Sequence, residues 1–244
     1  MKNRLTYFFL LICCPLMAQQ KGAVPYETAL KELQAVALNY AGYDFRMDFV
    51  KKTYMDISNS EPMSVEQGSI SRGKGFEYRL EQNGSILVQN NSGKLIIDSA
   101  EMVVLLNPVD SIFNAVDMNA YFTKDVKDKY SFERKEEGAV VSYIITTANA
   151  AEGTTTFTFG KSDFLLRSMK IVLPRSNYFN ESLDDTTEES PLITITYSGF
   201  RSLKTTGADL FVFDQWITKV NNVYVLKQPM ENFTLYDLRM PDNQ

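Results

Sequence analysis

Apolar and polar residues alternate along much of the chain, which predicts short β-strands joined by tight turns. The clearest stretch runs from Gly68 to Pro108. Within it Phe76, Tyr78 and Leu80 alternate with charged residues, the two-residue period of a half-buried strand. Asn83-Gly84 follows, and this dipeptide favours a two-residue hairpin because both positions tolerate positive φ. We therefore expect an antiparallel meander of four or five strands with one apolar face.

The same period recurs on both sides of this meander. Before it, Tyr43, Phe45, Met47 and Phe49 alternate with polar residues and predict a strand. Further strands are expected, bounded by Gly, Pro, Asn and acidic turn residues, at 64–72, 86–88, 94–98, 102–106, 130–135, 140–147, 154–159, 165–173, 192–200, 211–219, 223–227 and 233–239.

Two segments change to helical spacing. Residues 26–41 follow Pro25 and precede Gly42, which suit the start and the end of a helix. Its expected buried face holds Leu30, Leu33, Ala37 and Tyr40. Residues 110–127 begin at Asp110, a residue that can cap a helix, and predict one or two short helices. Both segments are expected to pack on the sheet.

The N-terminus has the pattern of a secretory signal peptide at residues 1–18. Lys2 and Arg4 precede an apolar run from Leu5 to Met17, and Ala18 suits the position before cleavage. The mature chain is then a single domain, 19–244, expected to be exported and soluble in the periplasm. Both cysteines lie in the signal, so no disulfide is expected. The net charge falls from −5 to −7 on cleavage, which argues against nucleic-acid binding.

Composition also narrows the chemistry. The chain has no histidine and the mature part has no cysteine, so a Ser-His-Asp triad, a cysteine nucleophile and a His/Cys zinc site are excluded. We expect no enzyme, no cofactor and no metal site. The acidic segment 176–191 is interpreted as a solvated loop. Its clustered carboxylates leave calcium binding as an alternative, although their spacing differs from an EF-hand.

The order of elements resembles that of the LolA/LolB-like family of periplasmic lipoprotein carriers. In that family an aromatic strand follows the first helix, here at 43–49. A glycine-lysine strand follows, here Gly93 to Asp98, in which Ile96 and Ile97 replace the family's aromatics. The segment from Thr194 to Phe200 resembles a later strand of the family. The resemblance spans about residues 26–200.

The resemblance implies an α+β fold: a strongly curved antiparallel half-barrel of about eleven strands whose concave face is covered by helices. It implies a non-catalytic periplasmic protein that binds lipoprotein acyl chains or other lipid. The candidate cavity residues are Tyr43, Phe45, Met47, Phe49, Phe76, Tyr78 and Leu80. Arg72 or Arg79 would take the place of the arginine that holds the family's helical lid shut. The alternative is a structural or interaction protein of an envelope complex, with inner- or outer-membrane partners and a cavity filled by its own side chains.

Overall fold

The computed structural model describes residues 20–41, 44–110, 129–147, 153–174, 190–203 and 208–239. Four of the features expected from the sequence lie outside these ranges. They are the signal peptide, Tyr43, the helical segment after Asp110, and the acidic segment except for its last two residues. They therefore remain sequence-based expectations.

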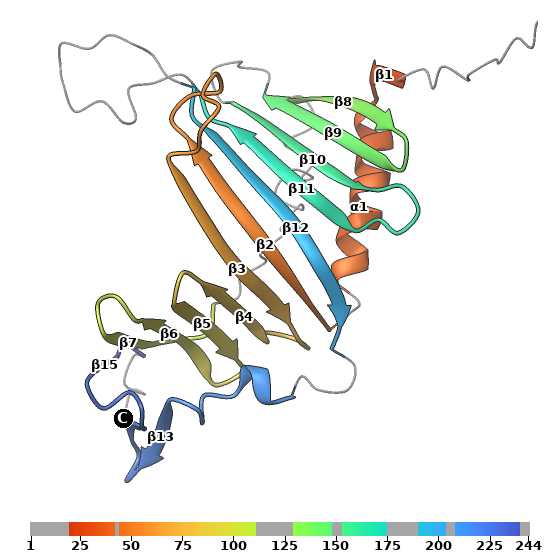
Figure 1. Ribbon diagram of the computed structural model, residues 1–244. Helices are drawn as coiled ribbons and strands as arrows, with labels where there is room; N and C mark the ends of the chain where they lie inside the picture. The colour runs from red at the N-terminus through yellow and green to blue at the C-terminus, as the bar shows by residue number, and fades with distance from the viewer. Residues whose placement is uncertain are drawn as a thin grey trace, which may run out of the picture.

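One large open sheet forms the body of the protein (Figure 1). Its order is β1-β8-β9-β10-β11-β12-β2-β3-β4-β5-β6-β7-β15, thirteen strands against the expected eleven or so. Among the strands that the structure describes, only the last pair, β15 with β7, is parallel. The strands are β1 (Gln20–Ala23), β2 (Phe45–Tyr54), β3 (Ser64–Arg72), β4 (Tyr78–Gln82), β5 (Ser85–Asn90), β6 (Gly93–Asp98), β7 (Val103–Asn107), β8 (Tyr130–Glu137), β9 (Val140–Thr147), β10 (Thr154–Gly160), β11 (Leu166–Val172), β12 (Leu192–Ser202) and β15 (Thr234–Asp237).

Most predicted strands are confirmed, and the departures have local causes. β4 begins at Tyr78 because Gly75, at φ 64°, opens a turn that the hydrogen bond from Gly73 N to Glu77 O closes. Phe76 therefore lies in this turn. The predicted strand at 211–219 is wrong: a short 3₁₀ helix, η4 (Ala208–Phe211), and a turn come first. Only β13 (Ile217–Val220) is extended, and it forms a separate hairpin with β14 (Val223–Leu226).

The α-helix α1 (Tyr26–Ala41) lies against one face of the sheet, which we call the inner face (Figure 1). Its buried stripe is Ala29, Leu33, Val36 and Tyr40. Leu30 and Ala37, expected on the buried face, are half-buried, so the helix is rotated by about one residue from the prediction. The rotation places Glu32 where its carboxylate accepts hydrogen bonds from Arg134 Nε and Tyr143 Oη, both at 3.1 Å.

The sheet carries two apolar cores, one on each face. On the inner face α1 forms one apolar core with side chains of β2–β4 and β8–β12, and the rings of Tyr40, Phe45 and Phe200 contact one another. On the opposite, outer face the C-terminal segment 208–239 covers β5–β7, and Trp216 and Phe213 are buried there. Trp216 is thus a core residue. Along the strand order, the buried core thus moves from the inner face to the outer face of the sheet near β4.

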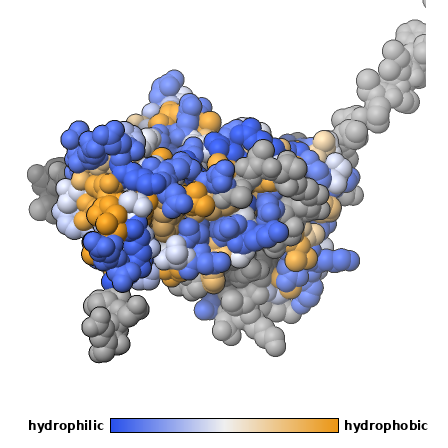
Figure 2. Space-filling view, turned by 90° about the horizontal axis from the view of Figure 1, so that it is seen from below, coloured by the Kyte–Doolittle hydropathy of each residue, from blue (hydrophilic) through white to orange (hydrophobic). Residues whose placement is uncertain are grey.

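The hairpin β13–β14 shows how the C-terminal segment is built. Tyr224 and Leu226 point into the outer core, while Val223 and Val225, which alternate with them, are exposed. Figure 2, which views the molecule from below, shows a small apolar patch among hydrophilic side chains at this end. In the described ranges no helix is long and apolar enough to cross a membrane.

Candidate functional site

The strand register aligns apolar side chains in a single row across seven strands of the inner face. Each member is paired with the next one in register, so all lie on the same side of the sheet. This inner row consists of Met47, Ile70, Leu80, Leu87, Ile96, Leu105 and Tyr236.

Exposure increases along the inner row from the core to the sheet edge. Met47 is 1% exposed and Ile70 is 7% exposed, because both belong to the core under α1. The next four members, from β4 to β7, are half-buried. Tyr236 on the edge strand β15 is 49% exposed. The row therefore links the closed interior to the surface through apolar side chains alone.

Polar residues border the row where it leaves the core. Rows on one face of a strand are two residues apart, about 6.8 Å. On one border Gln89 exchanges two 3.0 Å hydrogen bonds with the backbone of Asp110, and Lys94 pairs with the Asp110 carboxylate at 3.3 Å. On the other border lie Gln82, Ser85 and Asp98. At β5 and β6 the apolar strip is thus one side chain wide, whereas at β4 the buried Tyr78 lies beside Leu80.

Five of the seven candidate cavity residues predicted from the sequence come together on the inner face. Phe45, Met47 and Phe49 project from β2 and are at most 6% exposed. Tyr78 and Leu80 project from β4, in rows next to or within the inner row. Phe76 is elsewhere, 47% exposed in its turn.

The two candidate lid arginines lie on opposite faces. Arg72 pairs in register with Phe45 and Tyr78, so its side chain is on the inner face, half-buried. Arg79 is on the outer face, where Nη1 donates to Leu210 O at 3.2 Å. Arg79 thus contacts the C-terminal segment, and only Arg72 is placed beside the apolar row.

Three members of the row were not among the candidate cavity residues, although turn lengths could have placed them: Leu87, Ile96 and Leu105. Asn83-Gly84 is a two-residue turn, so Gln82 faces Ser85 and Leu80 faces Leu87. The next turn pairs Asn90 with Gly93 and brings Leu87 opposite Ile96. Tyr236 had no such signal, because β15 joins the sheet from far along the chain.

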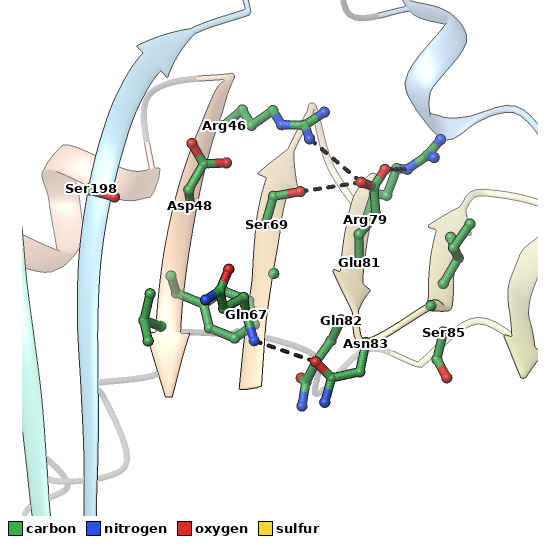
Figure 3. Close-up of a pocket in the computed structure, with 15 residues that line it drawn as sticks. Arg46, Asp48, Gln67, Ser69, Arg79, Glu81, Gln82, Asn83, Ser85 and Ser198 are labelled. Atoms are coloured by element: carbon green, nitrogen blue, oxygen red, sulfur yellow. Dashed lines mark hydrogen bonds and ion pairs between the residues drawn. The ribbon is translucent and has the colours of Figure 1, made fainter. Parts of the chain in front are cut away.

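A second concave site, the outer groove, lies on the other face across β12, β2, β3 and β4 (Figure 3). Its volume is about 600 Å³. Arg46 and Asp48 of β2, Ser69 of β3, Glu81 of β4 and Ser198 of β12 are among the residues that line it. Glu81 accepts from Arg79 Nε at 2.6 Å and forms a longer 3.5 Å ion pair with Arg46 Nη2.

Burial keeps three tyrosines of the inner face neutral. Loss of solvation raises the pKa of Tyr78 and of Tyr197 well above the usual value, and burial with the nearby Glu32 carboxylate does the same for Tyr143. In the described part of the chain, no group of three or more Asp, Glu, His or Cys residues could hold a metal ion. The charge beneath α1 is paired, since Arg134 Nε binds the Glu32 carboxylate at 3.1 Å.

No model of a known protein family matches the chain, and no curated sequence matches it either. Three similar solved structures are a LolA superfamily protein from Nitrosomonas europaea, a DUF1329 family protein from Desulfovibrio piger, and a domain from Vibrio parahaemolyticus described as an outer membrane lipoprotein-sorting protein. The identities are 12%, 12% and 13%, and the TM-scores are 0.34, 0.37 and 0.34. The matches cover 79%, 78% and 78% of this chain and 100%, 98% and 98% of the others.

The LolA superfamily, whose order of elements the sequence resembles, is thus represented among similar solved structures. At such low identity and TM-score this likeness carries no argument about ligands.

Proposed function

We propose that this protein is a non-catalytic, exported binding protein for acyl chains, free or attached to lipoproteins, and that it acts in the periplasm. The inner row is the observation that carries the proposal. A lipid chain needs a continuous apolar track, and the row supplies one from Met47 to Tyr236. On this proposal the sheet and its helices act as the half-barrel expected from the sequence.

The dimensions and the borders of the row fit one extended chain. Seven strands at about 4.8 Å spacing span about 29 Å. The four half-buried members, Leu80, Leu87, Ile96 and Leu105, keep apolar surface that a ligand could cover, at about 25 cal/mol per Å² removed from water. The polar borders would hold such a chain in line with the row and exclude a bulkier apolar ligand.

The test is binding of a fluorescent fatty acid by the mature chain and by row variants. Ile96→Asp and Leu105→Asp put a charge in the middle of the track at half-buried positions, where the carboxylate keeps contact with water. We expect both to fold and to lose most of the probe binding. Val225→Asp, at an exposed apolar position of β14 away from the row, is the matched control and should bind like the wild type. Absence of binding by the wild type would refute the proposal.

One observation favours the alternative function, a structural protein of an envelope complex. Phe45, Met47, Phe49 and Tyr78 are at most 6% exposed, so side chains already fill this part of the inner face. A self-filled interior would leave the row as a surface for a protein partner. Native mass spectrometry after mild purification distinguishes the two: bound lipid supports the carrier, and lipid-free protein with a stable partner supports the structural role.

A further inference from the structure

The outer groove contains a cation and an anion whose pairing is incomplete. Glu81 is the only ion-pair partner of Arg46 in the described ranges, and at 3.5 Å this contact is long. Nε of Arg46 is buried and lacks a hydrogen-bond partner among the described residues. A buried donor without an acceptor is costly, so an oxygen ligand at this guanidinium would stabilise the site.

Asp48 is the complementary group. It lies two residues from Arg46 on the same face of β2, in register with Ser69 and Ser198. Within the described ranges its carboxylate forms no hydrogen bond or ion pair, and Figure 3 shows no dashed line to it. Gly199, at φ 62°, leaves room for this carboxylate, because a Cβ at position 199 would lie 2.6 Å from Asp48 Oδ2. The carboxylate therefore remains an unused acceptor at the groove.

The other charges around the groove explain why Arg46 and Asp48 stay apart. Glu81 forms its shorter ion pair with Arg79, at 2.6 Å, and its longer one with Arg46, at 3.5 Å. Arg201 of β12 is in register directly opposite Arg46, and like charges at such positions repel. Figure 3 shows Arg46 extended across β3 toward Glu81, away from β12. The groove thus presents positive charge at Arg46 and negative charge at Asp48, one row apart.

We propose that the outer groove binds a small zwitterionic group, with its acidic part against Arg46 and its amine against Asp48. The hydroxyl groups of Ser69 and Ser198 flank the amine position. A simple anion would be repelled by Asp48 and a simple cation by Arg46, so the ligand needs both charges. The site is on the face opposite the inner row, and the inference does not depend on the proposed function.

The experiment is calorimetric titration with O-phosphoethanolamine, inorganic phosphate and ethanolamine. We expect the wild type to bind O-phosphoethanolamine at least about tenfold more tightly than either part, because each charged hydrogen bond contributes about 1.5 kcal/mol. Asp48→Asn should weaken O-phosphoethanolamine binding and strengthen phosphate binding. Arg46→Gln should weaken both. Lys52→Gln removes a charge from the same face of β2 outside the groove and should change neither.

The opposite response of the two ligands to Asp48→Asn is a readout that misfolding cannot produce. Equal effects of Asp48→Asn and Lys52→Gln, or no wild-type binding at millimolar ligand, would overturn the proposal. Co-sedimentation with phosphatidylethanolamine vesicles, lost in Arg46→Gln, would identify a lipid headgroup as the source. Binding of the free compound without co-sedimentation would identify a soluble zwitterion.

Discussion

The guanidinium carbon of Arg79 lies 5.2 Å from the centre of the Trp216 ring. Arg79 belongs to β4, where the apolar side of the sheet changes face, and Trp216 belongs to the outer core. This cation–π contact, together with the hydrogen bond to Leu210 O, attaches the C-terminal segment to the sheet.

A double-mutant cycle with Arg79→Met and Trp216→Leu should give a coupling free energy of about 1 kcal/mol in urea unfolding. The pair is largely buried, so water screens it little. The comparison pair Lys219 and Tyr224, 5.7 Å apart with Lys219 exposed, should couple by less than about 0.5 kcal/mol. Equal coupling in the two pairs would show that Arg79 does not anchor the segment in this way.

Met47→Asp and Phe76→Asp should differ sharply, although the sequence pattern treats both positions alike. Met47 is 1% exposed, so the substitution buries an unpaired carboxylate and should cost about 3 kcal/mol or more. Phe76 is 47% exposed, and its substitution should change the free energy of unfolding by about 0.5 kcal/mol or less. Urea unfolding followed by circular dichroism measures both. A stable Met47→Asp variant would mean that water reaches this part of the inner face.

Gly68→Ala should destabilise the protein by about 1–3 kcal/mol. An added Cβ would lie 2.1 Å from the Glu81 carbonyl oxygen and 2.7 Å from Cζ of Phe49, so backbone or ring must shift. Gly22→Ala is the control, since its Cβ would meet nothing within 4 Å. A thermal midpoint unchanged in both variants would show that the Phe49 ring can move away freely.

Acid should weaken the link between the β2–β3 loop and the start of β12. Hydrogen bonds from Ser58 Oγ and from the backbone nitrogens of Ser190 and Ser58 lower the pKa of Asp56 to about 2. A lowered folded-state pKa stabilises the fold above the unfolded value, about 3.9, and this contribution disappears as pH falls toward 2. The thermal midpoint of Asp56→Asn should therefore lie below that of the wild type at pH 7 and meet it near pH 2. Glu61→Gln, in the same exposed loop, is the matched control variant.

Alkali should unfold the protein through its buried tyrosines. Burial raises the folded-state pKa of Tyr197, so the neutral phenol stabilises the fold below pH ~10 and the contribution is lost above it. Tyr197→Phe should thus keep its helical and strand signal to higher pH than the wild type in a circular dichroism titration. Tyr236→Phe, at an exposed position, should unfold at the wild-type pH. An earlier transition in Tyr197→Phe would contradict this account.

The alternation of apolar residues was enough to locate nearly every strand. In β5–β7, however, it does not show which side chains point to the inner face and which to the outer face. In β5–β7 both alternating sets are apolar, as Leu95, Ile96 and Ile97 illustrate, so the two-residue period no longer distinguishes inside from outside. The change of face near β4 was therefore not predictable from a single strand. For the same reason the sequence did not place Arg79 on the outer face, since its position there depends on contact with Trp216, far along the chain.

Local signals also explain what was predicted well. β3 and β9 have the expected bounds because turn residues flank a clear alternation. α1 was located by Pro25 and Gly42, whereas its rotation depends on tertiary partners such as Arg134 and Tyr143, which bind Glu32. The candidate residues of β2 were brought together with those of β4 because hairpin register follows from turn length. The sequence did not indicate the outer groove, because its charged residues on β2 and β4 alternate with the apolar residues that form the inner core.

The parallel pairing of β15 with β7 has a consequence for biogenesis. During synthesis, β7 (Val103–Asn107) is complete long before residue 234 is available. Until then its unpaired backbone groups form an open edge on a strand that is apolar on both sides, a template for pairing with other chains. Truncation before β15 should therefore lead to aggregation in the cell rather than to a smaller soluble domain, and the last strand would serve the nascent protein as protection against self-association.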